Sequence, residues 1–140
     1  MKKQTTTPKT WNILLWIAQI LLSGSLLWSG SMKLFQAIEE LKAMWPWVGE
    51  VSPGFVKLTG VLDLIGAFGL VLPALLRFKP ILIPLSAIGI ILLMIAAGIF
   101  HISRGETEQI GVNIFFALFA GFIAWGRFKI SSGKSKKIRL

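Results

Sequence analysis

The chain has 140 residues, of which 54% are hydrophobic and only 15% charged, and its mean hydropathy is +0.73. This apolar content exceeds the roughly 45 to 50% usual for a soluble domain, and the charges stand mostly at the ends of long apolar runs, which excludes an ordinary water-soluble domain. The net charge of +9 comes with no basic face that carries stacking or groove-reading motifs, so we expect no nucleic-acid partner. Cysteine is absent, which excludes disulfides, thiolate metal sites and a dithiol relay within the chain.

Four apolar segments are long enough to cross a bilayer, whose hydrocarbon core of about 30 Å needs around 20 residues of helix. The spans are predicted at residues 11–35, 56–76, 80–102 and 110–127. They must be helices, because lipid cannot satisfy free backbone polar groups and the sequence shows no alternating pattern of a transmembrane barrel. The first span exceeds the roughly 7 to 15 apolar residues of a secretory signal, which favours an uncleaved helix over a cleaved signal.

The fold class expected from these spans is all-α, a bundle of four transmembrane helices that forms one membrane domain. A short segment precedes this domain and a basic tail follows it, so the predicted division is 1–10, 11–128 and 129–140. We interpret the tail as a solvated determinant of topology, with binding to anionic lipid as the alternative.

Lysine and arginine orient the bundle, because they gather in three places that antiparallel threading brings to one side of the membrane. These places precede the first span, separate the second from the third, and follow the fourth. The positive-inside rule therefore places both termini in the cytoplasm, and we expect a multi-pass protein of the cytoplasmic (inner) membrane. The residues concerned are Lys2, Lys3, Lys9, Arg77, Lys79, Arg127, Lys129, Lys134, Lys136, Lys137 and Arg139.

The segment from Gln36 to Phe55 is predicted to be one long loop on the outer side of the membrane. It carries Trp45-Pro46-Trp47, whose indole rings suit the headgroup region. We expect the loop to lie along the outer surface as a partial lid. Interfacial anchoring is the favoured role of its tryptophans, and a gate is the alternative.

Asp63 is the single acidic residue well inside a predicted span. A carboxylate at the centre of a membrane helix costs about 2.5 to 3.5 kcal/mol on insertion scales, so Asp63 needs a partner that offsets this cost. At 1.5 Å per residue, Asp63 lies roughly 9 Å below Lys57, in the outer half of the membrane.

Each of the other three spans offers a polar residue near that depth, namely Lys33, His101 and Asn113. Ser25, Ser29 and Lys33 recur at every fourth position and share one face of the first helix. Stripes of small residues beside Asp63 and Asn113 mark the sides where membrane helices pack. The sequence therefore predicts a polar cluster that opens outward.

This cluster has a structural and a functional interpretation. In the structural one, Asp63 pairs with Lys33 while His101 and Asn113 hydrogen-bond between helices. In the functional one, the cluster binds the head group of a small molecule or quinone, with Asp63 and His101 as candidate catalytic residues that handle protons. The candidate ligand-binding residues are Ser29, Lys33, Asp63, His101 and Asn113, and no metal-ligand cluster is recognised.

With these residues placed, the sequence resembles the DoxX and DoxX-like family of small four-helix bacterial membrane proteins, from Ile17 to Phe128. The motifs that carry the resemblance are Gly30-Ser31-Met32-Lys33-Leu34, Gly60-Val61-Leu62-Asp63-Leu64-Ile65-Gly66-Ala67, Gly69-Leu70-Val71-Leu72-Pro73, His101, Asn113 and Ala124-Trp125-Gly126-Arg127-Phe128. Asp63 departs from the family pattern, in which Glu is more usual. Some relatives are linked to quinone-dependent sulfur oxidation and others to membrane oxidoreductase assemblies in oxidative-stress defence.

The leading hypothesis is a DoxX-like membrane subunit that binds a quinone or similar small molecule and supports a membrane or extracytoplasmic redox partner. It is not expected to be an enzyme on its own, and quinone is the only cofactor class indicated. A structural scaffold or assembly subunit is the alternative, and a small proton-coupled exporter ranks third because Asp63 lies away from the midplane. The bilayer itself is the expected environment, and a homo-oligomer is compatible with each hypothesis.

Overall fold

A computed structural model describes residues 9–138, with side chains up to Ile130, and that part of the chain contains five α-helices, one 3-10 helix and no strand. The four long helices are apolar enough to span a membrane, which confirms the all-α prediction and the number of spans. Their bounds and those of the two short helices are α1 Lys9–Phe35, α2 Ile38–Met44, η1 Pro46–Glu50, α3 Pro53–Leu75, α4 Leu82–Ser103 and α5 Thr107–Ile138.

The last helix continues past the predicted end of the fourth span at residue 127. Its apolar part covers Thr107–Ile130, and the backbone stays helical to Ile138 through the basic tail. Lysine and serine do not break a helix as proline does, so the change from apolar to basic composition ends the span without ending the helix.

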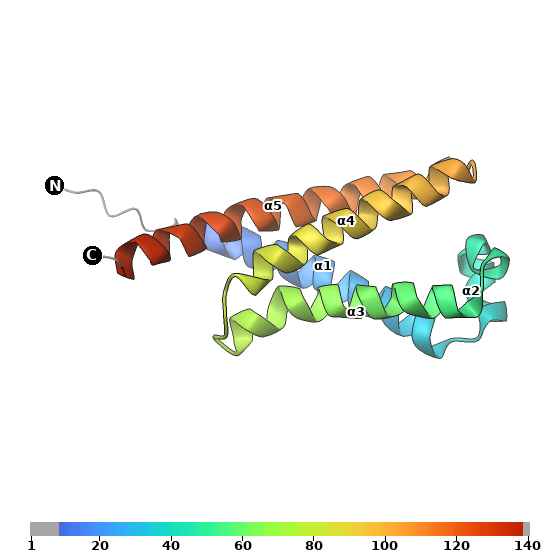
Figure 1. Cartoon of the computed structure of the whole chain (residues 1–140), viewed down its shortest axis with the longest axis horizontal. Coiled ribbons are helices and arrows are strands. Elements are labelled where there is room, and N and C mark those ends of the chain that lie inside the picture. The colour runs from blue at the N-terminus through green and yellow to red at the C-terminus, as the bar shows by residue number, and fades with distance from the viewer. Residues whose placement is uncertain (1–8, 139–140) are drawn as a thin grey trace.

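The long helices run along one axis of the molecule (Figure 1). The start of α1, the α3–α4 connection and the final turns of α5 lie at one end, here called the termini end. The short helices α2 and η1 and the α4–α5 connection lie at the opposite end, here called the cap end. The cations that orient the bundle and fall within the described side chains lie at the termini end, as the threading predicted, namely Lys9, Arg77, Lys79, Arg127 and Lys129. The assignment of this end to the cytoplasm stays a prediction.

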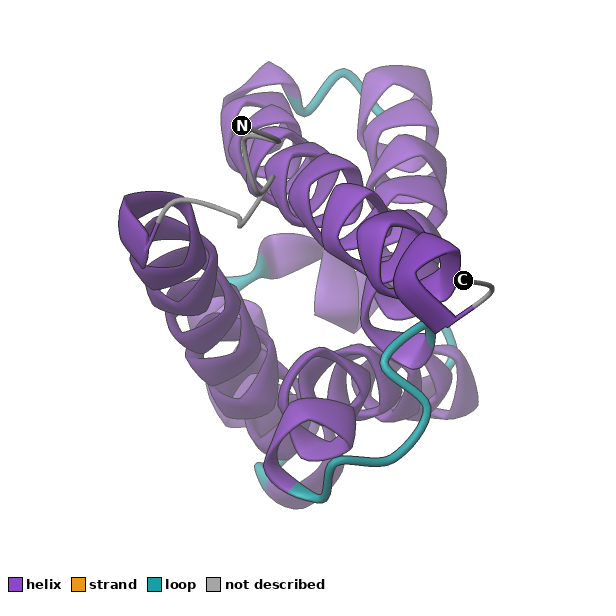
Figure 2. Ribbon diagram, turned by 90° about the vertical axis from the view of Figure 1, so that its left-hand side faces the viewer, coloured by secondary structure: helices purple, strands orange, loops and turns teal. Residues whose placement is uncertain are grey.

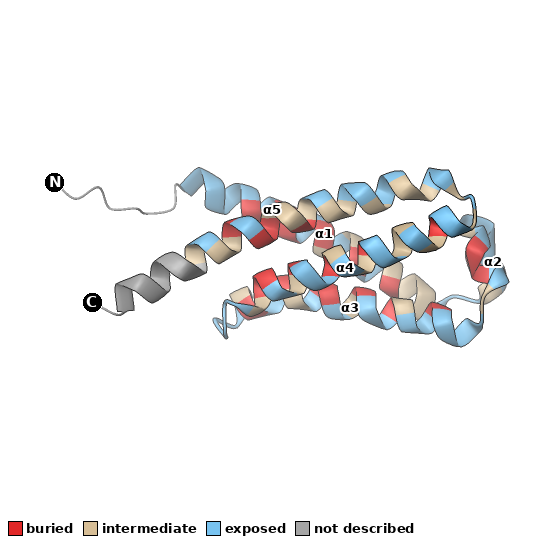
Figure 3. Ribbon diagram, turned by 45° about the horizontal axis from the view of Figure 1, so that its top comes forward, coloured by how far each residue is buried: buried red, intermediate tan, exposed pale blue. Residues whose placement is uncertain are grey.

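The bundle consists of two helix pairs, since α1 packs mainly against α3 and α4 mainly against α5. Figure 2 shows the long helices end-on, surrounding a common centre. Buried side chains from all four helices form the core, while large apolar side chains on the outer faces stay exposed, as expected where lipid is the solvent (Figure 3). The core includes Leu22, Leu26, Leu70, Ala87, Ile90, Ala120 and Ile123.

Local sequence explains where α3 and the α4–α5 connection begin and end. The hydroxyl of Ser52 accepts a hydrogen bond from the Phe55 N–H, and Pro53 occupies the first turn, which is a favourable start for a helix. Gly105, with φ at +72°, makes the tight turn after α4. These turns hold neighbouring helices antiparallel.

The prediction of a simple loop over residues 36–55 is wrong, because this segment contains α2 and η1. Leu41 and Val48 are fully buried, and with Trp47 and Val56 they form a small second core that folds the segment onto the ends of the long helices. The run of residues that carries these apolar side chains is short, and Pro46 interrupts it. A helical periodicity therefore cannot be recognised in it from sequence. Residues Ile38–Glu50 are here called the cap.

Trp47 packs inside the protein, and the anchoring of this segment at the membrane surface stays a prediction. Its ring is 8% exposed and packs edge-on against Phe100 and His101, with ring centroids 5.8 and 6.2 Å away. Trp45 is half-buried and lies edge-on to Trp28, 5.7 Å between centroids. Both indoles therefore pack against the ends of the long helices, Trp47 almost completely and Trp45 in part.

Candidate functional site

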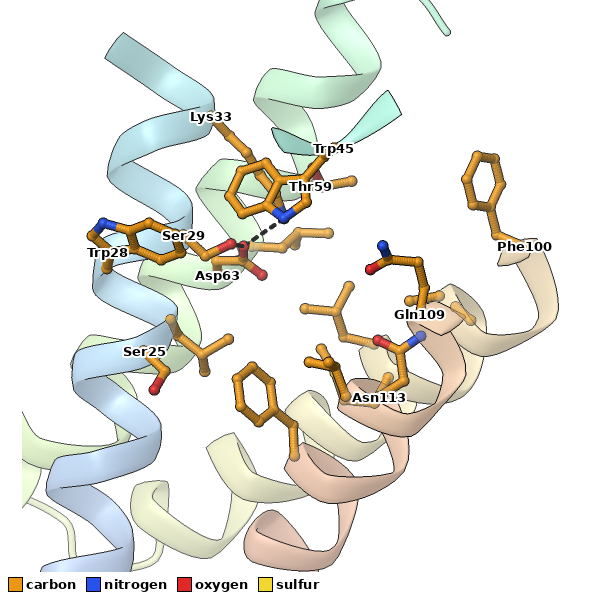
Figure 4. Close-up of a pocket in the computed structure, with 18 of the residues that line it drawn as sticks. Ser25, Trp28, Ser29, Lys33, Trp45, Thr59, Asp63, Phe100, Gln109 and Asn113 are labelled. Atoms are coloured by element: carbon orange, nitrogen blue, oxygen red, sulfur yellow. Dashed lines mark hydrogen bonds and ion pairs between the residues drawn. The ribbon is translucent and has the colours of Figure 1, made fainter. Parts of the chain in front are cut away.

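A pocket of about 830 Å³ lies toward the cap end, between the α1–α3 pair and the α4–α5 pair. All four long helices line it, and the cap contributes Trp45 and Trp47. Most of its lining is apolar, and its polar groups stand on two walls that face each other across the pocket (Figure 4). This arrangement is typical of sites that bind a largely apolar small molecule and orient it through a few polar contacts.

The first wall carries an ion pair between α1 and α3. The Lys33 ammonium lies 2.8 Å from Oδ2 of Asp63, and the Ser29 hydroxyl donates to the same oxygen at 3.0 Å. Asp63 is only 3% exposed, so the two donors offset the cost of placing a carboxylate inside a membrane helix. The spacing of Ser29 and Lys33 by one helical turn, recognised in the sequence, lets both reach one carboxylate.

Two glycines allow this ion pair to form. A Cβ at Gly30 would stand 2.7 Å from the backbone oxygen of Gly60, and a Cβ at Gly60 would stand 2.9 Å from the Cβ of Lys33. Any larger residue would push α1 away from α3. The small residues beside Asp63 therefore bring the backbones together, as small stripes do in membrane helix packing.

The cap covers the ammonium of the same lysine. The Lys33 Nζ lies 5.7 Å from the centre of the Trp45 ring and 5.8 Å from that of Trp47, within the range of cation–π attraction. Lys33 thus stands between the carboxylate and two indoles. Both tryptophans were recognised in the sequence, but their place in the pocket was not.

The second wall is formed by amides on α5. Gln109 and Asn113 line the pocket one helical turn apart, and Figure 4 shows both opposite the Lys33–Asp63 pair. The Asn113 Nδ2 is buried and has no hydrogen-bond partner among the described residues. The amide nitrogen of Asn113 therefore does not make the hydrogen bond between helices that the structural interpretation predicted. Gln109 was not predicted, because a glutamine near a helix start carries no distinctive signal.

His101 lines the pocket and is 7% exposed, but its partner is Glu106 and not Asp63. Its Nδ1 lies 2.7 Å from Oε2 of Glu106, and a carboxylate partner favours a proton on Nδ1, which leaves Nε2 as the acceptor of the neutral ring. The turn at Gly105 brings the two residues together, and this pairing was not predicted. The structure thus separates the cluster into an Asp63 group and a His101 group.

Glu106 belongs to a short chain of ion pairs at the cap end. Arg104 donates from Nε to Oε1 of Glu106 at 2.7 Å and also pairs with Glu50 of the cap. The hydrogen bond from His101, followed by that from Arg104, lowers the pKa of Glu106 below its ordinary value. The chain of charges ties the cap to the α4–α5 connection.

Ser25, which the sequence places on the same helix face as Ser29, also lines the pocket, but its hydroxyl donates to the Leu21 carbonyl of its own helix at 2.8 Å. Among the described residues, no three His, Asp or Glu side chains gather in a way that would hold a metal ion. The structure therefore brings Ser29, Lys33 and Asp63 into one hydrogen-bonded group. His101 and Asn113 line the same pocket but do not bond to that group.

Comparison with known proteins gives a match at the level of the family. No curated protein and no solved structure matches the chain. The model of the DoxX-like family matches residues 17–123, which include every residue that forms the two polar walls of the pocket. A match over this share of the sequence, together with four long apolar helices, shows that the chain is a multi-pass membrane protein of the DoxX-like family.

Proposed function

We propose that this DoxX-like protein binds the head group of a lipophilic small molecule, with quinones as the leading class, and supports the redox chemistry of a partner. The observation that carries the proposal is the pair of facing polar walls in an otherwise apolar pocket. One wall offers the Lys33 ammonium and the other the Asn113 amide nitrogen, which has no partner among the described residues. A ligand with acceptors on two edges would satisfy both walls.

A quinone head group fits this donor set. Its two carbonyl oxygens project from opposite edges of a flat apolar ring, and each accepts hydrogen bonds. A buried N–H without a partner costs about 1 to 3 kcal/mol, so a carbonyl oxygen near Asn113 would recover part of that cost on binding. The exposed Leu21, Trp28 and Val112 at the margin of the pocket would contact an isoprenoid tail that enters from the lipid.

The residues of this chain would bind and orient the head group and hold protons. A bound quinone would supply two-electron, two-proton chemistry, and the electrons would come from a membrane or extracytoplasmic partner, because the chain has no cysteine. Asp63 accepts its two hydrogen bonds through Oδ2, and no bond among the described residues uses Oδ1, which leaves that oxygen to accept a proton. His101 offers Nε2 for the same purpose.

The test is native mass spectrometry with quinone extraction on protein purified gently from its own membrane. We expect a quinone to co-purify with the wild type and with Ser103→Ala, a control outside the pocket whose hydroxyl donates to the Phe100 carbonyl of its own helix. It should be lost from Asp63→Asn and from Asn113→Leu. Wild-type protein that carries phospholipid alone would overturn the proposal.

A structural scaffold is the second candidate. It is favoured by the two hydrogen bonds that Oδ2 of Asp63 already accepts, because through them Lys33 and Ser29 hold α1 to α3 without a ligand. This candidate predicts that the swapped pair Lys33→Asp with Asp63→Lys restores both stability and the recovery of partner proteins. A swapped variant that folds and assembles but carries no quinone would show that quinone binding is distinct from the scaffold role.

A further inference from the structure

Arg127, at the termini end of α5, is held by neutral groups. Its Nε donates to Oε1 of Gln19 at 2.6 Å, its Nη1 donates to Oδ1 of Asn12 at 2.9 Å, and its guanidinium lies 5.7 Å from the centre of the Trp16 ring. Gln19 is fully buried and donates in turn to the Leu70 carbonyl at 2.6 Å, which turns its own oxygen toward the arginine. The position of the guanidinium is therefore fixed by α1 and α3 together.

None of these groups carries a negative charge. Amide oxygens and an indole ring orient a guanidinium, but they do not neutralise it. Nη2 is buried and has no partner among the described residues, whereas the bond from Nη1 to Asn12 is exposed. A charge on a membrane helix persists only where something compensates it. At the end of a span, where Arg127 stands half-buried, this compensation comes from an acidic residue, from water or from a lipid head group.

The acidic residues of the chain are too far away. All six lie toward the cap end, and Asp63 is the nearest of them to the termini end, although it stands roughly 10 Å along α3 from Leu70 and is already paired with Lys33. The other five are Glu39, Glu40, Glu50, Glu106 and Glu108. Among the described residues, no acidic side chain therefore supplies a counter-charge for Arg127.

The surroundings of Arg127 match the headgroup region of a bilayer. Trp11 and Trp125 are both exposed and lie edge-on, 5.7 Å between ring centroids, which joins the start of α1 to the last membrane turn of α5. Lys129 holds its Nζ 4.8 Å from the Trp125 ring, and Lys9 stands one turn before Asn12. Indoles and lysines in this arrangement are typical of the membrane–water boundary.

We propose that Arg127, together with Lys9 and Lys129, binds the phosphodiester of an anionic phospholipid between the ends of α1 and α5. The phosphodiester supplies the counter-charge that no described residue provides, and the exposed indoles pack against the glycerol and upper acyl region. A lipid is favoured over soluble phosphate because the site lies where a membrane span ends and aromatic rings flank it. This site is independent of the pocket at the cap end and of the function proposed for it.

The test uses the full chain, delipidated in detergent and incubated with phosphatidylglycerol, phosphatidylcholine or inorganic phosphate before native mass spectrometry. Wild type should retain one phosphatidylglycerol in preference to phosphatidylcholine. Arg127→Gln should lower that preference about fivefold, the effect expected for one cation near an anionic headgroup. Lys79→Gln, which removes an exposed cation at the same end, is the matched control and should leave the preference unchanged.

A second variant guards against loss of the fold in Arg127→Gln. Lys9→Gln combined with Lys129→Gln leaves the bonds of Arg127 to Gln19 and Asn12 intact and should still weaken retention of phosphatidylglycerol. Equal retention of both lipids by the wild type would overturn the proposal, and so would an equal loss in Lys79→Gln, which indicates diffuse attraction. Arg127-dependent binding of inorganic phosphate that abolishes lipid retention would assign the site to a soluble anion instead.

Discussion

The ammonium of Lys33 and the carboxylate of Asp63 meet at 2.8 Å because two glycines, one on each helix, let α1 and α3 approach at the same level. The pair is buried on one side by the helices and covered on the other by the two tryptophans of the cap. Its geometry thus depends on backbone contact, on charge and on the cap together, and each of these dependences can be measured.

Removing one partner of the ion pair should cost more stability than removing both. Lys33→Met leaves a carboxylate without its cation, and Asp63→Asn leaves a covered ammonium, so each is expected to lower the free energy of unfolding by about 3 to 5 kcal/mol. The double variant should recover a large part of that loss. Thermal unfolding in one detergent checks this, and strictly additive losses would contradict it.

Gly30→Ala should destabilise the protein by about 1 to 3 kcal/mol, because the added Cβ would lie 2.7 Å from the Gly60 carbonyl and α1 cannot retreat without breaking the Lys33 contact. Gly24→Ala is the matched control on the same helix, since nothing lies within 4 Å of a Cβ at that position. Unfolding temperatures of the two variants should differ clearly, and equal values would show that α1 and α3 do not pack as closely as described.

Lowering the pH should destabilise the folded protein, in part because Glu106 becomes protonated. Its pKa is lowered in the folded state by His101 and then by Arg104, so its contribution to stability is present above the ordinary carboxyl pKa of 4.5 and is lost as the pH falls through the lower folded value. Glu106→Gln should flatten the decline of the unfolding temperature in that acidic window. Glu108→Gln, an exposed neighbour, should follow the wild-type curve; if both variants follow it, Glu106 has no such role.

The cap should loosen when Arg104 is removed. Arg104 pairs with Glu50 of η1 and with Glu106, and its guanidinium lies 5.3 Å from the centre of the Phe100 ring. Arg104→Gln is therefore expected to speed hydrogen exchange in Ile38–Glu50 while the long helices stay protected. Lys42→Gln removes an exposed pair within the cap and should change exchange little. Unchanged exchange in Arg104→Gln would mean that the cap is held by its buried apolar core and not by these ion pairs.

The site was predictable from sequence at positions where a single polar residue is unfavourable in an apolar membrane span. Asp63 is an acid in an apolar span, so its need for a partner was predictable, with Lys33, His101 and Asn113 as the candidates at its depth. Helical spacing placed Ser29 on the same face as Lys33, but it did not identify Ser29 as a donor to Asp63. His101 was recognised for the same reason, but its partner was not. Glu106 lies beyond the helix end, and only the turn at Gly105 returns it to the histidine.

The sequence by itself determined the membrane environment, the number of membrane spans and the set of polar residues near one depth, because transfer of apolar side chains into lipid depends on composition and length alone. Only the tertiary structure decided that the segment after α1 folds into a cap, that the amide nitrogen of Asn113 is left without a partner among the described residues, and that Gln19 links Arg127 to α3. These features depend on which faces of four helices meet. Several rotations of similar helices bury similar apolar area, so hydropathy cannot select among them, whereas contacts between small residues and directional hydrogen bonds can.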